Sequence, residues 1–188
     1  MRNLKIITIA LLATFATTLA TAQTEKIDVK KSTITWVGKK ITGEHNGTVD
    51  IQEGNLIFKK GEVAGGSFTV DMTSLTATDL SGDWKAKLDG HLKSEDFFGT
   101  EKNPTSTLKF TKIAAKSEGI YKVTADLTIK GITNPVTFDL AVKGNKASTK
   151  FNIDRTKYGV KYNSKSFFDS IGDKAIYDDF ELSVNLVF

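Results

Sequence analysis

The stretch LSGDWKAKLDGHLKSEDFFGTEKNPTSTLKF, residues 80–110, decides the fold class because it is the only long segment that lacks the alternation of a strand. Leu80, Trp84, Leu88 and Leu92 recur every four positions, which is one apolar stripe of an α-helix. The spacing predicts a single short amphipathic helix in this part of the chain.

Two adjacent aromatic residues follow the predicted helix. Phe97 and Phe98 precede Gly99, and an alternating run through Leu108 and Phe110 then returns the chain to a strand. A helix followed by an aromatic plug either covers an apolar interior as a lid or closes the end of a packed core. Both interpretations stay open here, and the packed core is the simpler one.

Nearly all of the remaining chain from Lys30 onward alternates between apolar and polar residues in eight or nine runs. A sheet with one apolar face must pack on a second sheet or close on itself. Short sequential hairpins, one of them expected at residues 53–55, favour an all-β, eight-stranded antiparallel up-and-down barrel with one short helical insertion. The interior of such a barrel is filled by side chains or holds one small ligand.

Residues 1–22 have the composition of a signal peptide. Arg2 and Lys5 precede an apolar run over residues 6–19, and Ala20-Thr21-Ala22 is an A-x-A cleavage site. The apolar run is short for a transmembrane helix. We therefore expect cleavage after Ala22, a periplasmic or secreted protein without a transmembrane segment, and one domain over residues 23–188.

Charge and cysteine content exclude several classes of protein. Without Arg2 and Lys5, the 26 basic side chains become 24 against 22 acidic ones, and they form no basic block. Binding to nucleic acid is therefore not expected. The chain has no cysteine, which removes disulfides, thiol catalysis and zinc–thiolate sites.

The polar residues offer no catalytic or metal-binding pattern. His45 and His91 are the only histidines and lack metal-ligand spacing, and no G-x-S-x-G motif is present. Arg155 is the sole arginine after residue 22, and either ties the loop at 156–178 to a carboxylate or grips a ligand headgroup. We favour the loop tie, and expect no enzyme, no metal and no cofactor.

Several short motifs, in their order along the chain, resemble the YceI-like family of exported bacterial proteins. They are Trp36 with Gly38-Lys39, GEHNG at 43–47, GSFTVDM at 66–72, HLKSEDFF at 91–98, LTIKGIT at 127–133, DRTKYGV at 154–160 and DDFEL at 178–182. No single motif is specific, but their common order covers nearly the whole chain from residue 30.

The resemblance implies a lipocalin-like barrel that sequesters or carries a long isoprenoid or fatty-acyl lipid in its interior. The alternative is a filled-core barrel that binds a protein partner, and a homodimer stays open. The candidate ligand contacts are the inward apolar positions and the helix stripe, namely Trp36, Phe68, Val70, Met72, Trp84, Leu88, Phe97, Phe98, Phe110, Leu127, Ile129, Phe138, Phe151 and Phe180.

Overall fold

The computed structural model describes residues 21–168 and 171–188, so all but the last two residues of the expected signal peptide lie outside the described residues. The elements in chain order are β1 (Gln23–Lys26), β2 (Thr33–Lys40), β3 (Gly43–Lys59), β4 (Glu62–Ala77), α1 (Gly82–Lys93), β5 (Thr105–Ser117), β6 (Ile120–Ile129), β7 (Ile132–Lys143), β8 (Lys146–Asp154), the 3₁₀ turns η1 (Arg155–Tyr158) and η2 (Gly172–Lys174), and β9 (Ile176–Val187).

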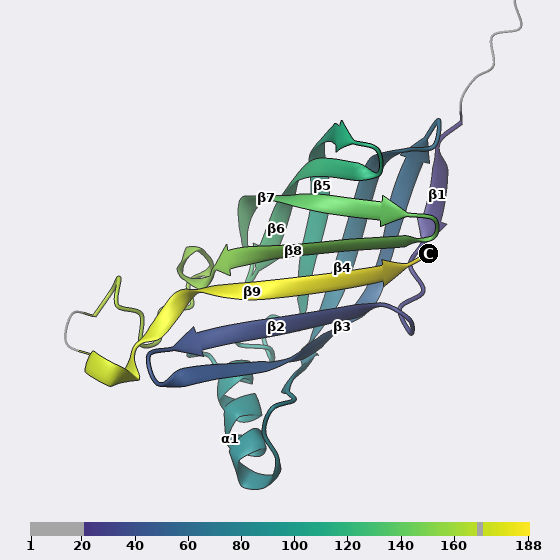
Figure 1. The fold of residues 1–188 in the computed structure, drawn as a ribbon. Helices are drawn as coiled ribbons and strands as arrows, with labels where there is room; N and C mark the ends of the chain where they lie inside the picture. Colours follow the sequence, from purple (N-terminus) through teal and green to yellow (C-terminus); the bar gives the residue numbers. More distant parts are fainter. Residues whose placement is uncertain (1–20, 169–170) are drawn as a thin grey trace, which may run out of the picture.

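Strands β2 to β9 form a closed antiparallel barrel in which neighbours in the chain are neighbours in the sheet (Figure 1). The barrel closes where β9 pairs with β2, with Trp36 opposite Leu182. The short strand β1 continues the same edge of β3 that β2 occupies, with Gln23 opposite Phe58. The prediction of an eight-stranded up-and-down barrel with one helix is confirmed.

The prediction of a hairpin at residues 53–55 is wrong, because these residues lie inside the long strand β3. The chain turns instead at Lys60 and Gly61, which have positive φ values of 55° and 82°. Gly54 is needed for a close approach rather than a turn, since a Cβ atom there would lie 2.6 Å from Cδ1 of Phe68 on β4.

Two seams of the barrel open towards the end that carries α1. The pairing of β7 with β8 covers only the three residues next to their hairpin, from Ala141 to Lys143. Strand β4 runs six residues beyond Asp71, which is its last residue paired with β5. The turn η1 fills the first opening with Tyr158, which is 2% exposed and packs with Leu127, Ile129 and Ile153. The second opening is where α1 packs.

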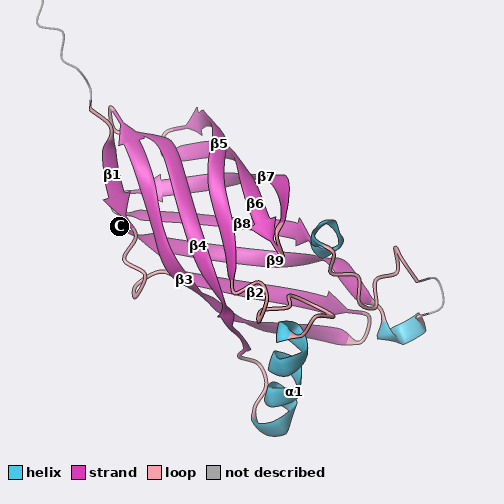
Figure 2. Ribbon diagram, turned by 180° about the vertical axis from the view of Figure 1, so that it is seen from behind, coloured by secondary structure: helices cyan, strands magenta, loops and turns pink. Residues whose placement is uncertain are grey.

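Helix α1 is joined to β4 through polar contacts. The carboxylate of Asp89 accepts hydrogen bonds from Thr76 Oγ1 and the backbone N–H of Ala77, both at 2.7 Å. No residue of the helix is fully buried, and the helix extends away from the barrel (Figure 2). Within the described ranges, no helix has the length and apolar character needed to cross a membrane.

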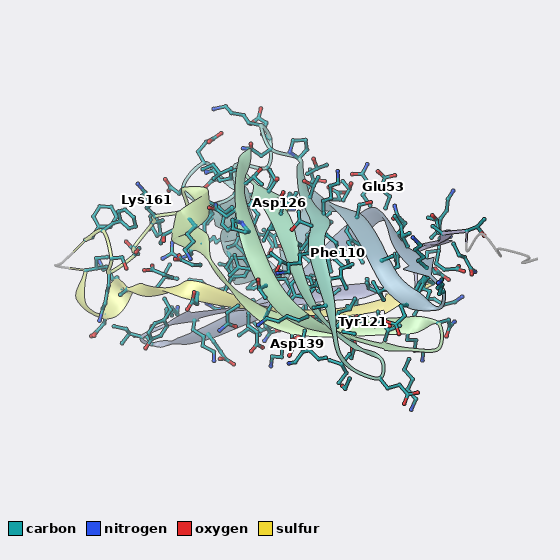
Figure 3. All side chains as sticks on the ribbon, turned by 90° about the horizontal axis from the view of Figure 1, so that it is seen from above. Glu53, Phe110, Tyr121, Asp126, Asp139 and Lys161 are labelled. Atoms are coloured by element: carbon teal, nitrogen blue, oxygen red, sulfur yellow. The ribbon has the colours of Figure 1, made fainter. Side chains whose placement is uncertain are left out.

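The inward faces of the strands form a large apolar cluster within the barrel and a second, smaller one around Tyr158. The view with side chains places the labelled Phe110 within the curve of the strands and Glu53 on the outer side (Figure 3). The apolar residues of each alternating run therefore face the interior, and the polar residues between them face solvent.

Candidate functional site

The interior of the barrel is not completely filled, and it contains two adjoining chambers of about 140 Å³ and about 90 Å³. The two chambers share five wall residues, so they adjoin each other where these residues lie. The shared residues are Ile34, Val70, Ser106, Leu127 and Leu182. Four of the five are apolar, and the space is suited to a flexible apolar molecule.

A row of aromatic rings lines the smaller chamber. Phe68 contacts Phe110 with ring centroids 5.8 Å apart, and Phe110 contacts Phe138 at 6.1 Å. Phe138 stacks on Phe151 at 4.7 Å. These rings are brought together from β4, β5, β7 and β8 because each occupies an inward position of its strand. They give this end of the interior a continuous apolar wall.

The larger chamber lies towards α1 and reaches the surface. Its walls include Leu92 at the end of the helix and the aromatic pair Phe97 and Phe98. Tyr177 and Asp179 also line it, and both are exposed, Tyr177 to 57%. The opening therefore lies beside the start of β9, next to residues 159–168, which are the segment after η1.

Twelve of the fourteen residues named from the sequence line one or both chambers, although contact with a ligand stays a prediction. They are Trp36, Phe68, Val70, Met72, Phe97, Phe98, Phe110, Leu127, Ile129, Phe138, Phe151 and Phe180. The remaining two belong to α1. Neither of them lines a chamber, and the reason is how the helix is attached.

Trp84 lies on the part of α1 that does not touch the barrel. Its side chain is 71% exposed, and the ammonium group of Lys87 lies 5.0 Å from the centroid of its ring. Leu88 packs against the edge of the core but lines neither chamber. The polar contacts of Asp89 hold the helix against the end of β4, so only its last turn, with Leu92, reaches the cavity.

His91, in the last turn of α1, holds the residues that follow the helix. The His91 ring meets Phe97 and Tyr162 edge to face, with centroid distances of 4.8 Å and 4.6 Å. Its Nε2 atom lies 3.4 Å from a carboxylate oxygen of Asp96. His91 thereby links the aromatic plug to the segment after η1, which is a structural role.

Arg155 ties the segment after η1 to the start of β9. Its guanidinium donates hydrogen bonds to the carbonyl oxygens of Val160, Ile176 and Tyr177, at 3.0, 3.0 and 3.1 Å respectively. The residue is only 4% exposed, and burial lowers the pKa of the guanidinium, against the opposing effect of Asp178 at 3.6 Å. The structure has the loop tie favoured from the sequence, but the hydrogen bonds of Arg155 go to backbone carbonyls rather than to a carboxylate.

The other histidine also has a structural partner. Nδ1 of His45 lies 2.8 Å from Asp79 Oδ2, while the backbone N–H of Asn46 donates to Asp79 Oδ1 at 3.2 Å. Burial would raise the pKa of Asp79, but these hydrogen bonds hold it below its ordinary value. In the described ranges, no three His, Cys, Asp or Glu side chains come together as they would around a metal ion.

Several wall residues were missed by the sequence reading. Ile34, Leu182 and Val184 line the interior and alternate with polar neighbours, so the same signal was present in β2 and β9. Ser106 also lines both chambers, but a serine gives no apolar signal and is found only from the structure.

The fold and the interior define a class: a closed β-barrel around an apolar cavity that opens at one end. The family model of the YceI-like domain matches residues 26–188, and the chain belongs to the YceI-like family.

Curated relatives match part of the chain. A UPF0312 protein of Staphylococcus aureus is 41% identical over 88 residues, covering 40% of this chain and 47% of the relative. The chain thus spans about half the length of the curated relatives that head the comparison.

Solved structures share the fold at low sequence identity. Burkholderia cenocepacia BcnA is similar with a TM-score of 0.64 and 20% identity, over 86% of this chain and 99% of that one. A polyisoprenoid binding domain from Saccharophagus degradans is similar with a TM-score of 0.57 and 13% identity, over 86% and 95% of the two chains. At these identities the likeness concerns the fold alone.

Proposed function

We propose that this protein is an exported lipid-binding protein whose barrel sequesters or carries one long apolar chain, a polyisoprenoid or a fatty-chain lipid. The observation that carries the proposal is the pair of adjoining chambers, whose shared walls are apolar except at Ser106. The polyisoprenoid binding domain with the same fold supports it.

The size of the hydrophobic effect favours a long ligand. Each methylene group moved from water into an apolar site is worth about 0.8 kcal/mol. Loss of the free motion of a ligand costs roughly 4 kcal/mol or more. A useful affinity therefore needs on the order of ten buried methylenes, which a polyprenyl or fatty tail supplies and a small polar metabolite does not.

The protein acts on its ligand by holding it, without chemistry. The walls of the chambers contain no nucleophile paired with a base. Of the two charged residues that line them, Arg155 is engaged by backbone carbonyls and Asp179 is exposed at the opening. Export through the signal peptide at residues 1–22 would place this carrier in the periplasm or outside the cell.

A series of saturated fatty acids of increasing length tests the proposal. Affinity is expected to rise roughly 4-fold for each added methylene and to level off when the interior is full. Ile34→Trp, at the boundary between the chambers, should level off at a shorter chain because the larger side chain takes up part of the interior. Thr35→Trp, on the exposed side of the same strand, is the matched control. Absence of binding, or an affinity that does not depend on length, would overturn the proposal.

A further inference from the structure

A single hydroxyl group interrupts the apolar row that β5 presents to the interior. Ser106, Leu108 and Phe110 occupy successive inward positions of this strand, and all three line the smaller chamber. Ser106 is only 6% exposed, and its Oγ atom has no hydrogen-bond partner among the described residues. A buried hydroxyl without a partner destabilises a folded protein, so this one requires an explanation.

The position of Ser106 supplies the explanation. It lies where the two chambers meet, and the other residues shared by both chambers are the apolar Ile34, Val70, Leu127 and Leu182. An ordered water needs two to four polar partners, and these four side chains offer none. The other buried polar atoms without partners, on Tyr158 and Asp178, line neither chamber.

We propose that Ser106 is a specificity-determining residue that makes a hydrogen bond to an oxygen atom partway along the bound chain. The ligand class is then a long-chain lipid with a neutral hydroxyl or carbonyl oxygen inside the chain, as distinct from a plain hydrocarbon tail. This inference rests on the proposed function, because it concerns how the same interior selects among apolar chains.

The chemistry of the site favours a neutral oxygen over a charged group. A carboxylate or phosphate at this depth would need a cation, since an isolated buried charge is far more costly than a buried dipole. Arg155 lines only the larger chamber, and its guanidinium already donates to three backbone carbonyls. A hydroxyl or carbonyl needs a single partner, which Ser106 provides.

Binding of two kinds of probe to three proteins tests the inference. The probes are octadecanoic acid and a set of its isomers that carry one hydroxyl at different carbons. The proteins are the wild type, Ser106→Ala and the control Thr105→Ala, which removes a hydroxyl from the exposed side of the same strand. The ligand-free Ser106→Ala protein should melt at or above the wild-type temperature, because the hydroxyl it lacks is unpaired without ligand.

We expect the wild type and Thr105→Ala to bind at least one hydroxylated isomer roughly 3- to 10-fold more tightly than the plain acid. Ser106→Ala should lose this preference and bind the plain acid as well as the wild type does. If the wild type binds the plain acid and prefers no isomer, the inference fails while the proposed function stands. A preference that persists in Ser106→Ala also overturns it. Failure of every probe to bind would refute the proposed function, and the inference with it.

Discussion

The carboxylate of Asp89 is the main polar link between α1 and the barrel, so removal of its charge should loosen the helix. The side chain is 19% exposed and accepts hydrogen bonds from Thr76 and Ala77, both at 2.7 Å. A hydrogen bond to a charged group contributes roughly 1.5–3 kcal/mol and a neutral one about 0.5–1.5 kcal/mol. Asp89→Asn keeps one acceptor and no charge, so it should cost about 2 kcal/mol, or roughly 4–8 °C in melting temperature.

The same contact predicts a dependence on pH. Burial alone would raise the pKa of Asp89, but hydrogen bonds from Lys85, Ala77 and Thr76 hold it below its ordinary value. A lowered pKa means that the stabilisation is complete above the unfolded value of about 3.9 and is lost as the pH falls through the folded pKa. The difference in stability between wild type and Asp89→Asn should therefore be constant from pH 7 to about 4 and shrink below that.

Urea unfolding and amide hydrogen exchange measure the two consequences separately. Asp89→Asn should speed exchange across α1 more than in the strands, because the helix is attached mainly at this point. Asp83→Asn, an exposed acid in the first turn of the same helix, is the control and should cost at most about 1 kcal/mol. Unchanged stability and unchanged exchange in α1 at pH 7 would show that the helix is held by other contacts.

Three further predictions concern other parts of the structure. Gly47→Ala should destabilise the folded protein by roughly 2–3 kcal/mol or more, since its Cβ would lie 1.9 Å from a backbone oxygen. Its control is Gly90→Ala, whose Cβ would have nothing within 4 Å, and which should leave the melting temperature unchanged or raise it. Phe97→Ala should speed release of a fluorescent fatty-acyl probe and Trp84→Ala should leave it unchanged; equal off-rates in the two variants would place the opening elsewhere. Arg155→Lys keeps the charge but lacks the planar donor group, so we expect the folded protein to lose about 2 kcal/mol of stability. Amide exchange in the segment after η1 should become faster, and wild-type exchange there would contradict the role of Arg155 in holding this segment.

The sequence was sufficient for the barrel because its signal is local. Alternation with period two states which residues of a strand face inward, and Phe68, Phe138 and Phe151 were placed in this way. The pattern failed at Gly54, because a glycine that admits a neighbouring ring and a glycine in a turn look the same in one dimension.

The parts that could not be predicted depend on contacts between distant segments. The stripe on α1 states which side of the helix is apolar but not how much of it meets the barrel. That is decided by the hydrogen bonds that Asp89 of α1 accepts from Thr76 and Ala77 of β4. The carbonyl groups bound by Arg155 come from residues up to 22 positions away. The hydroxyl of Ser106 matters only because the walls around it are apolar, which no single stretch of sequence states.

The central claim, that the barrel holds a long apolar chain, is tested most directly by native mass spectrometry of the protein purified after export without added lipid. We expect a second species heavier by the discrete mass of one long-chain lipid. In Ile34→Trp, whose larger side chain lies at the boundary between the chambers, we expect a smaller fraction of this species. Thr35→Trp should retain the wild-type fraction. A spectrum that shows only the unliganded mass, before and after incubation with fatty acids and polyprenols, would contradict the claim.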